Sequence, residues 1–306
     1  MNGFLLIDKP TGISSFGALK QLNKRFQIQR TAGKLGHGGT LDPNASGLLV
    51  AAIGRATRLL RFFLGSDKRY LATVQFGTQT TTDDSEGEVI ATADFDRIDQ
   101  ARIVEALAAF RGQISQVPPD FSALHVDGKR AYQLARHGER PELAPREVTI
   151  HAIEIVSCGL PQNPELNLDI ACSGGTYIRS IARDLGVALE SRAHLSALRR
   201  TQACHFDISQ ALPLSELLEH NDLEPLIHTC DVAMQHFNAV HLDWPGTQRL
   251  LHGQPVNLHL SRDGVYRLIC KDTGRMAAVV ERKDGKNDIV RLYTADEFQT
   301  FVEDRS

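Results

Sequence analysis

The sequence predicts a mixed α/β (α+β) fold followed by a small β-rich domain. Three observations lead to this prediction: segments with alternating apolar residues, segments of helical periodicity between them, and short strands with turn signals after about residue 235. The 306 residues suffice for about two domains of ~100–200 residues each. We expect one domain over residues 1–238 and a second over residues 239–306. The composition, 42% hydrophobic and 23% charged, excludes a disordered, collagenous or coiled-coil chain.

The first apolar run of the chain is short. It covers residues 4–7 and stops at Asp8. A signal-peptide core needs about 7–15 apolar residues and a membrane span about 20. We therefore expect a cytoplasmic chain with no membrane segment.

Two later segments alternate apolar and polar residues with the period of a strand. In residues 70–76 one face would hold Tyr70, Ala72, Val74 and Phe76. In residues 166–172 one face would hold Leu166, Leu168, Ile170 and Cys172. Because successive side chains of a strand point to opposite faces, each segment predicts a half-buried strand.

Two segments have the spacing of helices. Ile103, Leu107 and Phe110 predict a helix that begins after Asp96 and ends with Gly112 as its C′ residue. A second helix is expected after residues 173–176, with Thr176 as its N-cap. Its apolar stripe would hold Ile178, Ile181, Ala182 and Leu185, and its polar face Arg179 and Arg183.

The C-terminal residues read as a small all-β module. Segments 265–270, 276–280 and 289–293 are rich in Val, Ile and Tyr, and turn sequences separate them. The boundary to the body is expected near residues 243–246. Residues 262–291 hold eight basic and five acidic side chains, which is a weak signal for nucleic-acid contact. A plain structural cap explains this module equally well.

The cysteines offer neither a disulfide framework nor a zinc site, because no C-x-x-C pair occurs. We expect them to be core thiols. The five cysteines are Cys158, Cys172, Cys204, Cys230 and Cys270.

Charge is segregated along the chain. The net charge of −3 argues against a nucleic-acid protein, yet residues 9–66 hold nine basic side chains and one acid, Asp42. Residues 83–105 hold eight acids against two bases, and residues 214–231 hold five acids and no base. A basic segment suits a polyanion, because neutralised phosphates release counterions. A solvated cationic face is the equally weighted alternative.

The strongest local motif is the run GHGGTLDPNASGLL at residues 36–49. It is neither a Walker loop nor a dinucleotide fingerprint. Glycines precede Asp42 and Pro43 follows it, and the surrounding cations favour an ionised carboxylate. Asp42 is therefore a candidate nucleophile or base. Alternatively, Asp42 caps a helix that begins at Pro43, and the two roles are compatible.

Together with this run, four further motifs resemble the bacterial TruB family of tRNA pseudouridine synthases over residues 3–206. They are residues 4–12 (FLLIDKPTG), 67–70 (DKRY), 172–179 (CSGGTYIR) and 198–201 (LRRT). The resemblance implies a pseudouridine synthase fold with a mixed, largely antiparallel sheet and a C-terminal PUA-like domain. It also implies an isomerase that converts uridine 55 in the T loop of tRNA to pseudouridine, without cofactor or metal.

Carried over by the resemblance, Asp42 is the catalytic aspartate. Tyr70 packs on the extruded base, a stacking worth about 1–3 kcal/mol. The family roles of the other positions are these: Arg179 pairs with Asp42, Tyr177 lies beside it, His37 helps hold the target nucleotide out of the T loop, and Leu198 lines the pocket. Without the resemblance, Tyr70 and Leu198 are core residues, Arg179 is a surface arginine and His37 is a solvated loop residue. Lys9 is expected to steady the loop or a phosphate.

Four positions depart from the family pattern. Gly38 replaces Thr, Phe121 replaces Tyr, His125 replaces Lys and Cys204 replaces Gly. These departures would bear on RNA affinity and loop order rather than on the reaction.

The functional hypothesis is a monomeric tRNA pseudouridine synthase that binds the T stem-loop of tRNA and needs no protein partner. Two alternatives come from other classes. A tRNA-binding or folding module would bind RNA and form no product. A carbohydrate-active hydrolase would release sugar from neutral substrates, with little salt dependence, and would normally need a second carboxylic acid, which the basic segment does not supply.

Overall fold

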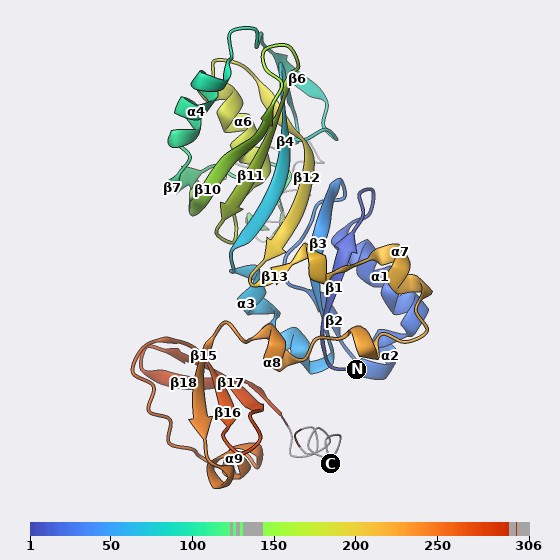
Figure 1. Cartoon of the computed structure of the whole chain (residues 1–306), viewed down its shortest axis with the longest axis vertical. Coiled ribbons are helices and arrows are strands. Elements are labelled where there is room, and N and C mark those ends of the chain that lie inside the picture. Colours follow the sequence, from blue (N-terminus) through green and yellow to red (C-terminus); the bar gives the residue numbers. More distant parts are fainter. Residues whose placement is uncertain (123–124, 127–128, 131–142, 294–297, 299–306) are drawn as a thin grey trace.

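The computed structural model describes residues 1–122, 125–126, 129–130, 143–293 and 298. A long sheet with helices beside it forms the body, and a smaller sheet forms the C-terminal part (Figure 1). The predicted mixed α/β fold with a C-terminal β domain is confirmed. Along the main path of the large sheet the strands run β14 (Leu212–Pro213), β1 (Gly3–Lys9), β3 (Ala45–Ile53), β12 (Ala193–Ala203), β4 (Lys68–Phe76), β11 (Glu165–Cys172), β10 (Arg146–Cys158) and β7 (Gly112–Gln116).

Strand β12 is the junction of this sheet. It pairs in parallel with β3, where Leu198 lies opposite Ala45. On its other edge it pairs antiparallel with β4, where Arg200 lies opposite Tyr70. The short strand β2 (Leu35–His37) pairs with the other end of β3. Since Asp42 lies in the connection from β2 to β3, this pairing brings it beside the Leu198 region of β12.

The apolar run at the N-terminus is a core strand. Leu5 and Ile7 pack into one apolar cluster, whereas Phe4 and Leu6 pack into a second cluster on the opposite side of β1. A strand buried on both faces has a continuous apolar sequence rather than an alternating one. The second cluster continues into the C-terminal sheet, where it includes Leu268 and Val279.

The two strands predicted from alternation are confirmed. In β4 the residues Tyr70, Ala72, Val74 and Phe76 are buried, and in β11 every second residue is buried in the same way. The sheet has helices beside both of its ends, as Figure 1 shows. These helices are α1 (Ser15–Phe26), α2 (Ile28–Ala32), α3 (Leu60–Leu64), α4 (Gln100–Ala108), α6 (Ile178–Ala188), α7 (Leu214–Glu219) and α8 (Cys230–Ala233).

Helix α4 is shorter than predicted. Its N-cap is Asp99, whose carboxylate accepts from the Arg102 backbone N–H at 2.9 Å, and the helix ends at Ala108. Gly112 has a φ of +81° but begins β7 instead of ending the helix. The predicted end was therefore wrong by one turn, because the apolar Phe110 lies in the following turn and packs on the same core.

The N-terminus of α6 also differs from the prediction. Its N-cap is Tyr177, which makes no side-chain capping bond. The Thr176 hydroxyl instead donates to the Ser173 carbonyl at 2.9 Å. The Tyr177 backbone N–H donates to Gln116 Oε1 at 2.9 Å, so a side chain from β7 serves as the cap partner. The predicted apolar stripe of α6 is buried, but Arg179 is buried with it.

The C-terminal sheet runs in the order β15 (Asn238–Leu242), β16 (Gly264–Cys270), β17 (Met276–Lys283) and β18 (Lys286–Leu292). The three predicted strands correspond to β16, β17 and β18. Strand β15 pairs in parallel with β16, and Asp243 caps helix α9 (Trp244–Leu251), which follows β15. None of the helices formed by the described residues is long and apolar enough to cross a membrane.

Candidate active site

The loop that carries Asp42 is pinned by hydrogen bonds from the N-terminal segment. The Ser15 hydroxyl accepts from the Leu41 backbone N–H at 2.7 Å and donates to the Leu41 carbonyl at 3.0 Å. On the far side of Asp42, the Gly12 N–H donates to the Pro43 carbonyl at 2.9 Å. Residues 43–44 form a turn that leads into β3, so the alternative of a helix capped by Asp42 was wrong.

Lys9 belongs to this framework. It is fully buried, and its ammonium donates to the carbonyls of Pro10 (2.8 Å), Ile13 (2.6 Å) and Pro43 (3.3 Å). Burial lowers the pKa of Lys9 to about 8. Of the two roles expected for Lys9, the geometry supports the steadying of the loop, because a buried ammonium bonded to three carbonyls has no free face for a phosphate.

Arg200 holds the other side of the loop, and sequence reasoning missed it. Its side chain is among the largest that are fully buried. Its Nε donates to the Leu48 carbonyl at 2.7 Å and its Nη2 to the Gly39 carbonyl at 3.1 Å. Beside it, Gly47 has a φ of +100°, and a Cβ there would lie 2.3 Å from the Arg200 carbonyl oxygen. Gly47 is thus the local sequence signal that the backbone of β3 approaches the Arg200 backbone closely.

Asp42 and Arg179 form an ion pair. The distance from Arg179 Nη2 to Asp42 Oδ2 is 3.0 Å, and the side chains are 8% and 44% exposed respectively. Arg179 also donates to the carbonyls of Thr82 and Phe121, each at 3.1 Å, and contacts the Asp84 carboxylate at 3.5 Å. The alternative of a surface arginine was wrong, because loops from residues 82–84 and 121 cover this face of α6.

The acidic residues 83 and 84 owe their position to α6. Arg183 Nη1 lies 2.8 Å from Asp83 Oδ2, and its Nη2 donates to the Val117 carbonyl at 2.9 Å. Burial raises the pKa of Asp83, and Arg183 acts against that shift. Two arginines one helical turn apart thus draw part of the acidic segment onto the site.

A small pocket joins three of the expected site residues. Asp42, Arg179 and Leu198 line it, together with Asp84 and neighbouring residues of β12. Tyr70 is 8% exposed on β4, and burial raises its pKa, with the Asp42 charge adding to the shift. Burial likewise raises the pKa of Tyr177, at the start of α6. The two phenols therefore flank the Asp42 region without lining this pocket.

His37 lies on β2 and is half-buried, so it is not a solvated loop residue. Burial, helped by the Arg200 charge, lowers the pKa of His37. Its Nδ1 is buried and has no hydrogen-bond partner among the described residues. The imidazole is neutral, and it does not line the Asp42 pocket.

The departure at Gly38 has a packing cause. A Cβ at this position would lie 2.6 Å from the Cβ of Phe63. Phe63 is buried on α3 and stacks on Phe206 with ring centroids 6.1 Å apart. The space that a side chain at position 38 would need is thus taken by Phe63. The side chain of His125 lies outside the described residues.

Comparison with known protein families gives two matches, which together cover residues 24–235. The family described as "TruB family pseudouridylate synthase (N terminal domain)" matches residues 24–178. The family described as "tRNA pseudouridylate synthase B C-terminal domain" matches residues 179–235.

Similar proteins agree with these matches. A tRNA pseudouridine synthase B from Gloeobacter violaceus is 48% identical over 84% of this chain and 87% of its own. One from Trichormus variabilis is 40% identical over 93% of this chain and 96% of its own. In fold, the structure resembles the chain in "Crystal Structure of a Cbf5-Nop10-Gar1 Complex", with a TM-score of 0.71, 22% identity, and coverage of 95% and 84% of the two chains. The chain therefore belongs to the TruB family of tRNA pseudouridine synthases, isomerases that act on uridine in tRNA.

Proposed function

We propose that this chain converts uridine 55 in the T loop of tRNA to pseudouridine, with Asp42 as the group that acts on the ribose. The observation that carries the proposal is the Asp42–Arg179 pair, in which the carboxylate is half-exposed and its partner is buried and fixed by two carbonyls. A carboxylate held in this way keeps one orientation.

The reaction makes one demand that Asp42 meets. The bond from the ribose to a ring nitrogen breaks, the uracil turns while bound, and a ring carbon bonds to the same ribose carbon. An ionised carboxylate starts this sequence by attacking the ribose or by removing its 2′ proton. Each route uses one carboxylate. The bonds from Lys9, Ser15 and Arg200 to the loop position that group before the substrate arrives.

A hydrolase of glycosidic bonds would need a second carboxyl group as a proton donor. Asp84 does fold in beside Arg179, but its oxygens already accept from Thr82 Oγ1 at 2.5 Å and the Glu86 N–H at 3.0 Å. Asp84 thus accepts two hydrogen bonds and lies 3.5 Å from Arg179, so it is placed to position that arginine. This arrangement favours the isomerase over the carbohydrate-active alternative.

Extrusion of the target nucleotide needs apolar and aromatic surface. Leu198 supplies part of the Asp42 pocket. We propose that Tyr70, which lies beside this pocket, stacks on the base, and that Tyr177 flanks the base. The neutral imidazole of His37 would hold the nucleotide outside the T loop without a charge to desolvate. Stacking of about 1–3 kcal/mol per base matches the few kcal/mol that extrusion costs.

The polyanion that the charge pattern predicts would be the T stem-loop. Eight of the nine basic side chains of residues 9–66 are exposed, and the exception is Lys9, which is bonded to the loop. They are Lys20, Lys24, Arg25, Arg30, Lys34, Arg55, Arg58 and Arg61. We propose that this face binds tRNA phosphates, and that the enzyme acts as a cytoplasmic monomer without a protein partner.

The test uses unmodified tRNA transcripts with uridine or cytidine at position 55. The parent protein should form pseudouridine only in the first transcript, and Asp42→Asn should form none. Pseudouridine formed at other uridines of the cytidine-55 transcript would disprove the proposed specificity for position 55. Equal yields from Asp42→Asn would disprove the role of Asp42. Tight tRNA binding by a parent protein that forms no product would establish the binding module instead.

A further inference from the structure

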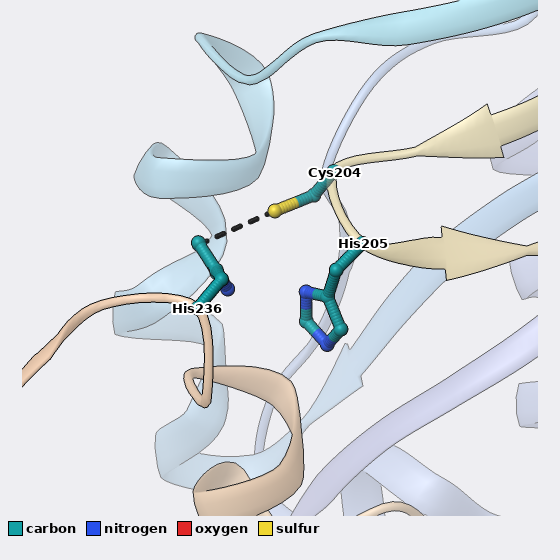
Figure 2. Close-up of side chains that lie close together, drawn as sticks. All are labelled: Cys204, His205 and His236. Carbon is teal, nitrogen blue, oxygen red and sulfur yellow. Dashed lines mark hydrogen bonds between the residues drawn. The ribbon is translucent and has the colours of Figure 1, made fainter.

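A cysteine and two histidines meet on the surface of the body, next to the chain that leads into the C-terminal sheet. Cys204 and His205 form the turn between β12 and β13 (Phe206–Asp207), and His236 lies two residues before the start of β15. Figure 2 shows the three side chains gathered in one place. The sequence predicted no zinc site because C-x-x-C pairs are absent. The fold nevertheless brings together ligand types that lie 32 residues apart in the sequence.

The spacing of the ligand atoms suits one small metal ion. Cys204 Sγ lies 3.2 Å from His236 Nε2, and all three ligand atoms lie within 4.8 Å of one another. With zinc at about 2.3 Å from sulfur and 2.0–2.1 Å from nitrogen, a tetrahedral site has ligand atoms about 3.3–3.6 Å apart. The widest separation therefore has to close by no more than about 1.5 Å. His236 is exposed and can make that movement by side-chain rotation.

His205 is already held as a metal ligand would be. Its Nε2 lies 3.1 Å from the Val232 carbonyl oxygen, which can only accept, so Nε2 carries the proton. The lone pair is then on Nδ1. That atom is buried and has no hydrogen-bond partner among the described residues. Ligating histidines characteristically donate their other ring N–H to a carbonyl in this manner.

Cys204 occupies a backbone conformation that favours glycine. Its φ is +58°, a region in which an L-residue is less stable than glycine. The conformation of the turn therefore does not favour a cysteine. The thiol, which lies beside two imidazoles, is instead suited to bind a metal ion.

We propose that Cys204, His205 and His236 bind a zinc ion, through Sγ, Nδ1 and Nε2. On binding, the Sγ–H bond breaks, the proton passes to solvent and a zinc–sulfur bond forms, with no change of oxidation state. One thiolate and two imidazoles suit zinc, whereas magnesium and calcium prefer oxygen ligands. The fourth position faces a surface pocket lined also by Phe62, Asp67 and Phe237, where water completes the coordination.

Such an ion would join two parts of the fold. The β12–β13 turn continues the strand that carries Leu198 and Arg200, and His236 lies at the entrance to the C-terminal sheet. Zinc would therefore fix the point at which the C-terminal domain leaves the body. This inference is independent of the reaction proposed above.

The test titrates cobalt(II), as a spectroscopic substitute for zinc, into the reduced full-length protein. We expect one cobalt per chain, with a thiolate-to-cobalt charge-transfer band that equimolar zinc abolishes. Cys204→Gly should lose the band while keeping the fold, because glycine suits the φ of this turn. His236→Gln should weaken zinc binding by at least about 10–100-fold. Loss of a residue that only hydrogen-bonds to a metal ligand already has an effect of this size, and His236 would bind the metal directly. Cys158→Ser, which removes a partly exposed thiol elsewhere, should behave as the parent.

Thermal unfolding supplies a second measurement. Zinc should raise the unfolding midpoint of the parent and of Cys158→Ser, but not that of Cys204→Gly, and magnesium should raise none of them. Zinc affinity unchanged in Cys204→Gly would overturn the proposal, as would cobalt binding without the charge-transfer band. A site that takes copper and excludes zinc would overturn the choice of metal.

Discussion

The guanidinium of Arg179 approaches Asp42 at 3.0 Å while bonded to the Thr82 and Phe121 carbonyls, so an arginine fixed from three sides orients a half-exposed carboxylate. A planar group with five donors fits this arrangement, whereas an ammonium cannot make the same set of bonds. The orientation of Asp42 thus depends on loops far away in the sequence.

Arg179→Lys should keep the positive charge and lose this geometry. Loss of a hydrogen bond to a charged group is worth about 1.5–3 kcal/mol, which corresponds to a rate of pseudouridine formation about 10–100-fold lower. Single-turnover assays on saturating tRNA measure the rate. Arg183→Lys is the matched control. Arg183 lies on the same helix as Arg179, but it binds Asp83 and does not contact Asp42. Equal losses in the two variants would contradict an orienting role specific to Arg179.

Arg200→Met should destabilise the Asp42 loop. Buried acceptors at Gly39 and Leu48 would lose their partner, at about 1–3 kcal/mol for each unsatisfied group. Denaturant unfolding should show the lower stability, and hydrogen exchange should show faster exchange in residues 38–43. Full protection of these residues would show that Arg200 does not hold the loop.

Stability should depend on pH through Lys68. This ammonium is 7% exposed and donates to the carbonyls of Phe63, Leu64 and Ser66 at the end of α3. Burial lowers its pKa from 10.5 to about 8. The unfolded chain therefore binds more protons between pH 8 and 10.5, and the contribution of Lys68 to stability rises with pH in that window.

The comparison for this prediction is Lys68→Met. The free energy of unfolding of the parent, relative to this variant, should increase from pH 7.5 to pH 10 by at most about 3 kcal/mol. Denaturant titrations at both values measure it. A difference that stays constant or falls would show that the ammonium is not desolvated as described.

Gly38→Thr should destabilise this chain. The new Cβ would meet Phe63 at 2.6 Å, and overpacking of a core typically costs about 1–3 kcal/mol. Thermal unfolding measures the loss. An unchanged melting temperature in Gly38→Thr would contradict the packing account.

Binding of tRNA should weaken with salt through the exposed cations of residues 20–61. Lys34→Gln should lower the affinity and reduce the slope of log Kd against log salt by about one unit if Lys34 contacts a phosphate. Arg97→Gln removes an exposed base in the acidic segment and should leave the slope unchanged. Identical slopes for the parent and Lys34→Gln would show that Lys34 does not contact a tRNA phosphate.

The features that the sequence predicted well are those set by local periodicity. The buried face of β4 follows from apolar residues two positions apart. The apolar stripe of α6 follows from apolar residues three or four positions apart. The features that the sequence could not predict are contacts between segments that lie far apart in the sequence. The burial of Arg179 requires residues 82–84 and 121, and the match of Gly38 to Phe63 requires α3 to pack on the loop.

The most direct measurement is the single-turnover yield of pseudouridine at position 55, taken together with tRNA affinity, for Asp42→Asn and Asp84→Asn. We predict that Asp42→Asn binds tRNA as the parent does and forms no product, and that Asp84→Asn retains slower turnover because it only positions Arg179. Product formed by Asp42→Asn at the parental rate would contradict the central role given to this carboxylate.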